Sequence, residues 1–86
     1  SIMARKIKIY STGTCPRCDK SKQLLTKWGI EYIEVRVDQS QKGLKEMLKR
    51  TDNARTVPQI FLGDDYIGGL DELTEAHMDG DLEGIS

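Results

Sequence analysis

The sequence predicts one α/β domain in which helices flank a mixed four-stranded sheet. Its 86 residues leave room for a single core, and a hydrophobic content of 37% is typical of a folded globule. Segments of apolar period two alternate with segments of helical period, in the order strand, helix, strand, helix, hairpin, helix. The first three elements predict a parallel crossover, and the hairpin completes the sheet with antiparallel pairing.

The first predicted strand and helix surround the two cysteines. Residues 6–10 alternate polar and apolar side chains, which puts Ile7 and Ile9 on one face of a strand. A helix then begins at Pro16, because proline is well tolerated at the first helical position, and Gly29 is expected to cap its C-terminus. The apolar stripe of this helix consists of Cys18, Leu24, Leu25 and Trp28.

A second strand and a second helix follow. Residues 32–38 alternate again, with Ile33, Val35 and Val37 together on one face. Apolar residues at helical spacing then predict a helix over residues 41–50.

The last third of the chain predicts a hairpin and a final helix. Ile60–Leu62 and Tyr66–Ile67 flank the turn residues 63–65, which is a hairpin signal. Asp71 is expected to cap the last helix, and residues 78–81 to form a frayed end. The complete order resembles the thioredoxin fold in its minimal form.

Composition limits the functional classes. The formal net charge of −1 argues against a dedicated nucleic-acid binder, and no apolar run is long enough to cross a bilayer. Ser1 and Ile2 precede Met3, which resembles a native start, so we expect residues 3–86 to form the single domain and residues 1–2 to be extraneous. We expect a monomeric cytoplasmic protein without a nucleic-acid or membrane partner.

Charge is divided unevenly along the chain. Residues 1–50 carry 12 basic and 5 acidic side chains, whereas residues 51–86 carry 1 basic and 9 acidic side chains. One interpretation is that folding mixes both halves over one surface. The other is a positive field around the cysteines that attracts an anionic substrate.

The two cysteines lie one helical turn apart, as Cys15 and Cys18. With one histidine, they are too few for a zinc site within one chain, and they are few for a disulfide-stabilised secreted scaffold. Their spacing indicates a redox-active or metal-handling pair. A passive disulfide or two core cysteines are the alternative.

Cys15 is the predicted nucleophile. If Pro16 is the first helical residue, Cys15 is the N-cap, and its sulfur faces the free amides of Arg17 and Cys18 at the positive end of the helix dipole. These groups favour thiolate and lower the pKa of Cys15 below the value of about 8.5 of a free cysteine. Cys18, inside the helix, is expected to be less exposed and to act as the resolving thiol.

Three segments resemble the glutaredoxin family. They are the active-site sequence Cys15-Pro16-Arg17-Cys18, the segment Thr56-Val57-Pro58-Gln59-Ile60-Phe61 and the turn Gly68-Gly69-Leu70-Asp71. Their order and spacing agree over residues 7–78. The resemblance implies the thioredoxin fold in its glutaredoxin form and a dithiol oxidoreductase.

The resemblance also implies a ligand site. It places a cis peptide before Pro58, beside Cys15, and leaves Thr56 and Val57 to pair with an extended peptide such as glutathione. Gly69, Leu70 and Asp71 would hold its γ-glutamyl end. Asp71 would face the ammonium; a role as helix cap alone is the simpler alternative.

Two positions depart from the family pattern. Arg17 stands where tyrosine is usual, and Thr12 stands where a basic residue is frequent. Arg17 is expected to pair with a glutathione carboxylate and support the Cys15 thiolate, or to be simply solvated. His77 and Trp28 are not expected to be catalytic, and Trp28 is expected to be a packing residue.

The sequence therefore predicts an enzyme that reduces protein disulfides and protein-glutathione mixed disulfides, with glutathione as reducing co-substrate and no metal. The main alternative is a hydrogen donor to ribonucleotide reductase that thioredoxin reductase reduces. Two further alternatives bind metal. A copper chaperone would need the element order β-α-β-β-α-β, and an iron-sulfur carrier would share a cluster between two chains through Cys15 and glutathione.

Overall fold

The computed structural model describes residues 6–85. The extraneous residues expected at Ser1 and Ile2, and the native start expected at Met3, lie outside the described residues. The strands are β1 (Ile7–Ser11), β2 (Tyr32–Arg36), β3 (Gln59–Leu62) and β4 (Asp65–Gly68), and the helices are α1 (Pro16–Lys27), α2 (Gln41–Arg50) and α3 (Leu70–Met78). The predicted order of elements is confirmed.

The four strands form one mixed sheet in the order β2-β1-β3-β4. β1 pairs in parallel with β2 and antiparallel with β3, and β4 pairs antiparallel with β3. The second strand ends at Arg36 instead of residue 38, because the amide of Gln39 turns back to donate to the carbonyl of Arg36. α2 fills the segment where a copper chaperone would need a pair of strands, which argues against that alternative.

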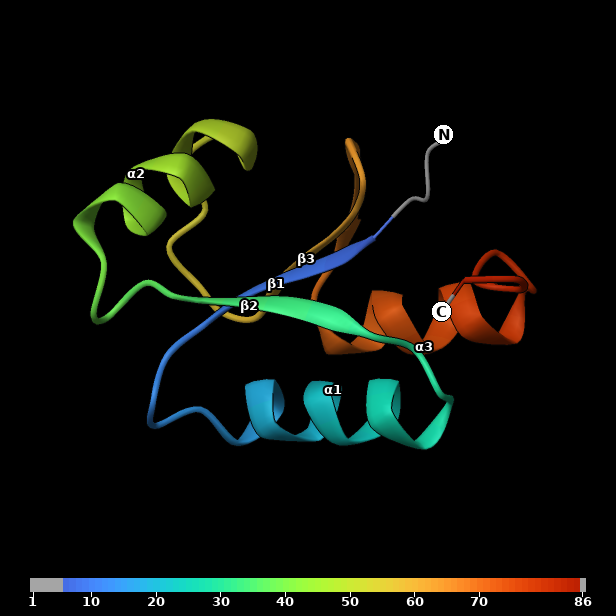
Figure 1. Ribbon diagram of the computed structural model, residues 1–86. Helices are drawn as coiled ribbons and strands as arrows, with labels where there is room; N and C mark the ends of the chain where they lie inside the picture. The colour runs from blue at the N-terminus through green and yellow to red at the C-terminus, as the bar shows by residue number, and fades with distance from the viewer. Residues whose placement is uncertain (1–5, 86) are drawn as a thin grey trace.

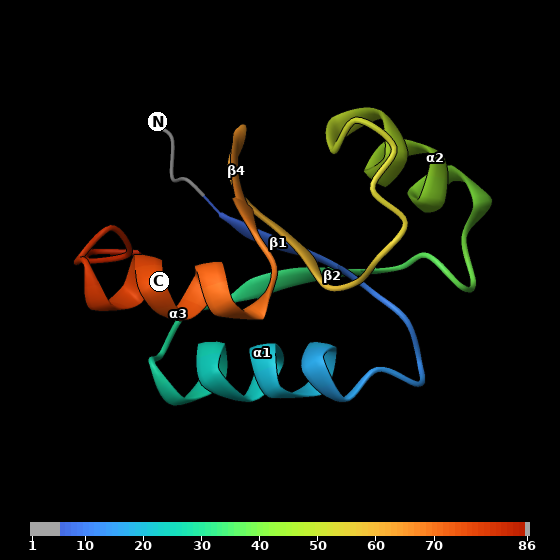
Figure 2. The same ribbon diagram turned by 180° about the vertical axis from the view of Figure 1, so that it is seen from behind.

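The helices cover both faces of the sheet. α1 and α3 lie against one face and α2 against the other (Figures 1 and 2). Because side chains alternate along a strand, Ile7 and Ile9 pack with Leu25 of α1 and Leu73 of α3 on the first face. Tyr10 enters the core beneath α2 on the second face.

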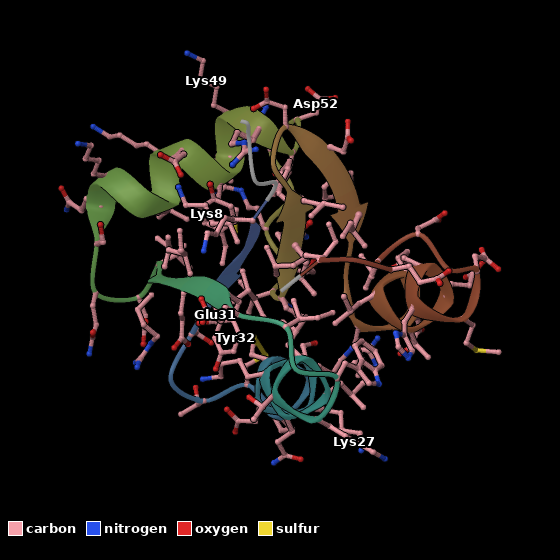
Figure 3. The ribbon with its side chains drawn as sticks, turned by 45° about the vertical axis from the view of Figure 1, so that its right-hand side comes forward. Lys8, Lys27, Glu31, Tyr32, Lys49 and Asp52 are labelled. Carbon is pink, nitrogen blue, oxygen red and sulfur yellow. A yellow bond between two sulfur atoms is a disulfide. The ribbon has the colours of Figure 1, made fainter. Side chains whose placement is uncertain are left out.

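A polar network attaches α2 to the sheet. Lys8 extends from β1 toward α2 (Figure 3), where its ammonium donates to Glu46 at 2.8 Å. Tyr10 also donates its hydroxyl to Glu46, and Arg50 donates to the carbonyl of Gly63 at 2.9 Å. These bonds tie α2 to β1 and to the β3–β4 turn.

α1 and α3 lie side by side with their N-termini at the same end of the sheet (Figure 1). Both C-termini close through a Schellman motif, which needs a residue with positive φ after the helix. Gly29 fills this position after α1 with φ 73°, and Gly80 fills it after α3 with φ 82°. The expectation of a cap at Gly29 is confirmed.

The chain does not fray after α3 as expected. A turn follows the Schellman motif and brings Leu82 into the core, where only 4% of its surface is exposed. The frayed-end prediction is wrong because backbone hydrogen bonds close the end of α3 and because Leu82 and Ile85 both pack against the core. None of the helices in residues 6–85 combines the length and the apolar character that a membrane crossing requires.

α3 begins earlier than expected. Its N-cap is Gly69, and Asp71 is already the second helical residue, so the prediction that Asp71 is the cap is wrong. The amide of Gly69 donates to the Glu72 carboxylate at 2.9 Å. This bond satisfies the backbone at the cap itself and leaves the Asp71 carboxylate free to face the neighbouring helix.

Candidate active site

Cys15 is the N-cap of α1, as predicted. Its backbone is extended, with φ −143° and ψ 97°, and Pro16 is the first helical residue. The sulfur takes the place of a capping oxygen and accepts a hydrogen bond from the amide of Cys18 at 3.0 Å. Of the two amides expected at the sulfur, the structure gives this bond to Cys18.

Cys15 and Cys18 are joined by a disulfide, with their Cα atoms 5.2 Å apart. Cys15 is 8% exposed and Cys18 is completely buried. The expected order of exposure is confirmed, although the opening at Cys15 is narrow. A reagent from solvent can therefore approach the pair only from the Cys15 side.

The bend at Pro58 forms the second wall of the site. The Val57–Pro58 peptide is cis, as expected. The Val57 carbonyl oxygen lies 3.8 Å from Cys15 Sγ, so the bend and the N-terminus of α1 are in contact. The prediction that these two segments adjoin is confirmed.

The segment before Pro58 is held in place by a residue that the sequence analysis did not single out. Gln59 is 5% exposed, and its amide donates to the carbonyl oxygen of Thr56 at 2.9 Å and to the Thr56 hydroxyl at 3.2 Å. The Tyr66 hydroxyl donates to Oε1, the side-chain oxygen of Gln59, at 2.5 Å. A polar residue inside an apolar strand was the available signal, since a buried amide needs partners.

The N-terminus of α3 forms the third wall. A Cβ added at Gly69 would lie 3.5 Å from the carbonyl oxygen of Pro58, so the two backbones pass close to each other. Leu70 is half-buried and Asp71 is exposed. The positive ends of α1 and α3 therefore meet around Cys15 and Pro58, an arrangement that favours negative charge.

Arg17 and Asp71 bridge these two helix ends. Arg17 Nη2 lies 3.3 Å from Asp71 Oδ1, and the side chains are 57% and 76% exposed. From the sequence, Arg17 is predicted to face a ligand carboxylate and Asp71 a ligand ammonium, each independently of the other. The structure pairs them with each other.

The loop that leads to Cys15 is anchored from the end of β2. The Asp38 carboxylate accepts a hydrogen bond from the amide of Gly13 at 3.0 Å and two from the Arg36 guanidinium. The Arg36 hydrogen bonds hold the pKa of Asp38 at about 2, below its ordinary value of 3.8. The carboxylate is thus ionised at neutral pH and available to the loop.

A small cleft of about 220 Å³ runs beside Val57. Thr12, Asp38 and Arg55 contribute its polar lining, and α2 supplies an apolar floor. Thr12, which stands where the family pattern frequently has a basic residue, therefore lines this cleft. Among the described residues that line the cleft, Arg55 is the only lysine or arginine.

His77 and Trp28 do not belong to this site. They stack on each other at the C-terminal ends of α3 and α1, with ring centroids 3.7 Å apart. Trp28 also packs against the main core, as expected. Within residues 6–85, His, Cys, Asp and Glu side chains form no group of three or more that could hold a metal ion.

Comparison with known proteins agrees with this geometry. The glutaredoxin family model matches residues 7–67. A Synechocystis sp. protein named "Probable glutaredoxin" is 40% identical over 80 residues, which cover 93% of this chain and 73% of the relative. Glutaredoxin 3 of Escherichia coli is 38% identical over 79 residues, which cover 92% of this chain and 94% of the relative.

Solved structures show the same relationship. The buckwheat glutaredoxin-glutathione complex has a TM-score of 0.77 and 33% identity, covering 91% of this chain and 73% of that one. A cysteine pair at a helix N-terminus beside a cis-proline, together with these sequence and structural matches, assigns the chain to the glutaredoxin family of thiol-disulfide oxidoreductases.

Proposed function

We propose that this protein is a dithiol glutaredoxin that uses glutathione to reduce protein disulfides and protein-glutathione mixed disulfides. The observation that carries the proposal is the position of Cys15. Its sulfur caps α1, is the more exposed of the pair and lies 3.8 Å from the backbone oxygen of Val57. A thiolate here has the amide of Cys18 and the positive end of α1 to stabilise it, and an adjacent backbone that can hold a peptide disulfide.

The proposed reaction begins with the reduced protein. The Cys15 thiolate attacks the glutathione sulfur of a mixed disulfide, a new sulfur-sulfur bond forms, and the substrate protein leaves as a thiolate that takes up a proton. A second glutathione thiolate then attacks the glutathione sulfur on Cys15. This step releases glutathione disulfide and restores the Cys15 thiolate.

Cys18 provides the second way to resolve a mixed disulfide at Cys15. It lies one turn inside α1 and is fully buried, so it reaches Cys15 and little else. With a protein disulfide, the Cys15 thiolate attacks one substrate sulfur and the other leaves as a thiol. The Cys18 thiolate then attacks the Cys15 sulfur, and the second substrate sulfur leaves reduced. Two glutathione molecules then reduce the resulting Cys15–Cys18 disulfide, the form described here.

The three walls of the site support glutathione as the co-substrate. Glutathione is a short peptide with carboxylates at both ends and an ammonium at the γ-glutamyl end. Thr56 and Val57 would pair with its backbone, and Gly69, Leu70 and Asp71 would bind the γ-glutamyl end at the start of α3. Arg17 would assist there. The buckwheat neighbour with glutathione gives this proposal further support.

The cleft beside Val57 supports a role for Arg55. Arg55, the only lysine or arginine that residues 6–85 contribute to its lining, would face the second carboxylate of glutathione. No resident metal is part of the proposal. We also propose that the protein acts as a monomer. We place it in the cytoplasm, because reduction by glutathione requires a reducing compartment.

The decisive experiment measures reduction of a small glutathione mixed disulfide with glutathione and glutathione reductase. We expect Cys15→Ser to abolish turnover, because no attacking sulfur remains. Cys18→Ser should keep much of it, because a second glutathione can complete the cycle, and it serves as the matched control. Equal loss in both variants would contradict the assigned roles.

The ribonucleotide reductase donor is tested in the same assay. Activity with thioredoxin reductase and none with glutathione would favour that alternative. Absorbance of anaerobically purified protein tests the iron-sulfur alternative, since a cluster absorbs in the visible range and a dithiol does not.

A further inference from the structure

The Arg17–Asp71 pair has properties of a contact that can exchange partners. Within residues 6–85, neither side chain makes another ion pair or hydrogen bond. Both are more than half exposed, and exposed pairs of this kind contribute little to stability. A ligand can therefore replace the contact if it brings charges of both signs.

The pair is located where the proposed ligand presents such charges. Arg17 is the second residue of α1 and Asp71 the second residue of α3. The γ-glutamyl end of glutathione carries an ammonium and a carboxylate on the same carbon, so one end of the ligand matches both halves of the pair.

The geometry points to an exchange of partners, with Arg17 as a specificity-determining residue. In the free protein the guanidinium occupies Asp71. When glutathione binds, its ammonium takes the place of the guanidinium at Asp71, and the released guanidinium pairs with the neighbouring carboxylate. One ion pair is thereby replaced by two, and no charge is left without a partner.

The exchange discriminates by ligand chemistry, and it rests on the proposed function because glutathione is its ligand. A ligand with an ammonium and no carboxylate displaces Arg17 and leaves the guanidinium unpaired. A ligand with a carboxylate and no ammonium draws Arg17 away and leaves Asp71 unpaired. Only the zwitterionic end compensates for both losses.

The test uses three mixed disulfides of one small thiol. The first partner is glutathione, the second is γ-aminobutyryl-Cys-Gly, which lacks the carboxylate, and the third is glutaryl-Cys-Gly, which lacks the ammonium. Single-turnover reduction by pre-reduced protein is followed for the unmodified chain, Arg17→Gln and Asp71→Asn. Lys20→Gln removes an exposed charge from the same helix and is the control.

The expected pattern is a reversal of sign. Arg17→Gln lowers the second-order rate constant for glutathione by about two- to fivefold. The same variant raises the constant for the aminobutyryl peptide by about twofold, because Asp71 has lost its competitor. Asp71→Asn likewise lowers the glutathione value and raises that of the glutaryl peptide. Arg17→Lys should recover part of the glutathione rate.

Two results would overturn the inference. If both variants lower all three constants in parallel, or match Lys20→Gln, Arg17 and Asp71 do not exchange partners. If the unmodified protein fails to reduce the glutathione mixed disulfide, the proposed function itself is wrong and the exchange is wrong with it. Thermal unfolding of each variant verifies that the comparison is made between folded proteins.

Discussion

The two ends of the α1–α3 pair are built from different contacts. At the end away from the cysteines, the rings of Trp28 and His77 stack with an interplanar angle of 11°, and glycine motifs close both helices. At the cysteine end, the helices are joined by the exposed Arg17–Asp71 ion pair. The first end is fastened by ring packing and backbone hydrogen bonds, the second by charges that salt screens.

The difference separates stability from chemistry. Both helix dipoles direct their positive ends toward Cys15, where an anion gains most from them. A firm apolar contact at that end would exclude the ligand, whereas an exposed ion pair yields to it. Substitutions at the far end should therefore change the free energy of unfolding and leave thiol exchange alone.

The largest effect is expected at Leu82. Leu82→Ala removes most of a buried side chain from the far end and should lower the free energy of unfolding by about 3 kcal/mol. Urea unfolding measures this change. The rate of disulfide reduction by folded protein should stay the same.

Ile33→Ala is the matched control for Leu82. Ile33 is 51% exposed on the edge strand β2, so its truncation should cost much less. Equal losses in the two variants would show that the turn after α3 is not part of the core.

Local rules were sufficient to predict the parts of the site that are close in sequence. The Cys15 cap follows from a cysteine immediately before proline, and the end of α1 follows from Gly29. The cis peptide before Pro58 required the family resemblance, because most bonds before proline are trans.

Contacts between distant elements could not be predicted in the same way. The Arg17–Asp71 and Trp28–His77 contacts depend on α3 lying beside α1 in the same direction. The apolar pattern of each helix shows which side is buried, but it does not show which residues of the two helices lie opposite each other. The start of α3 was misplaced because Asp71 is the better cap by residue type. The bond from the Gly69 amide to Glu72 determines the actual start.

A pair of glycine variants sharpens the comparison of the two ends. Gly29 has φ 73° and open space around it, so Gly29→Ala should cost between about 1 and 2 kcal/mol through backbone strain alone. Gly69 has φ −98°, which alanine also adopts, so Gly69→Ala adds no left-handed strain and should cost less, about 0.5 to 1 kcal/mol, because alanine is a poorer N-cap than glycine.

Activity should show the opposite order. The methyl group added at Gly69 lies near the Pro58 carbonyl, where the peptide ligand is proposed to bind, so the rate with glutathione should fall. Gly29→Ala should leave that rate unchanged. Urea unfolding and the mixed-disulfide assay are applied to both variants. A slower rate for Gly29→Ala, or an unchanged rate for Gly69→Ala, would contradict the prediction.

The ring stack itself should contribute a smaller amount. His77→Ala removes the stacking contact with Trp28, but alanine is also the better helix former. We expect a net loss of about 0.5 kcal/mol by urea unfolding, with no change in disulfide reduction. Slower disulfide reduction by this variant would show that the Trp28–His77 end also affects thiol exchange, which would contradict the division between the two ends.

The smallest effect concerns Glu34, which fastens the middle of α1 between the two ends. The Ser11 hydroxyl and the Lys22 ammonium both donate to its carboxylate, and these bonds lower the pKa of Glu34 below the ordinary value of 4.5. The unfolded chain therefore binds this proton first as the pH falls. Stability from Glu34 is complete above pH 4.5 and is lost as the pH falls through the folded pKa.

Glu34→Gln should accordingly cost less than about 0.5 kcal/mol at pH 7, and less still at pH 3, where the unfolded chain already binds the proton and the unmodified protein has lost part of this contribution. Urea unfolding at the two pH values measures the difference, with Glu83→Gln as an exposed control. A difference that stays constant would mean that Glu34 acts through packing alone. A difference that shrinks would show that charge holds α1 to the sheet between its fixed and its exchangeable end.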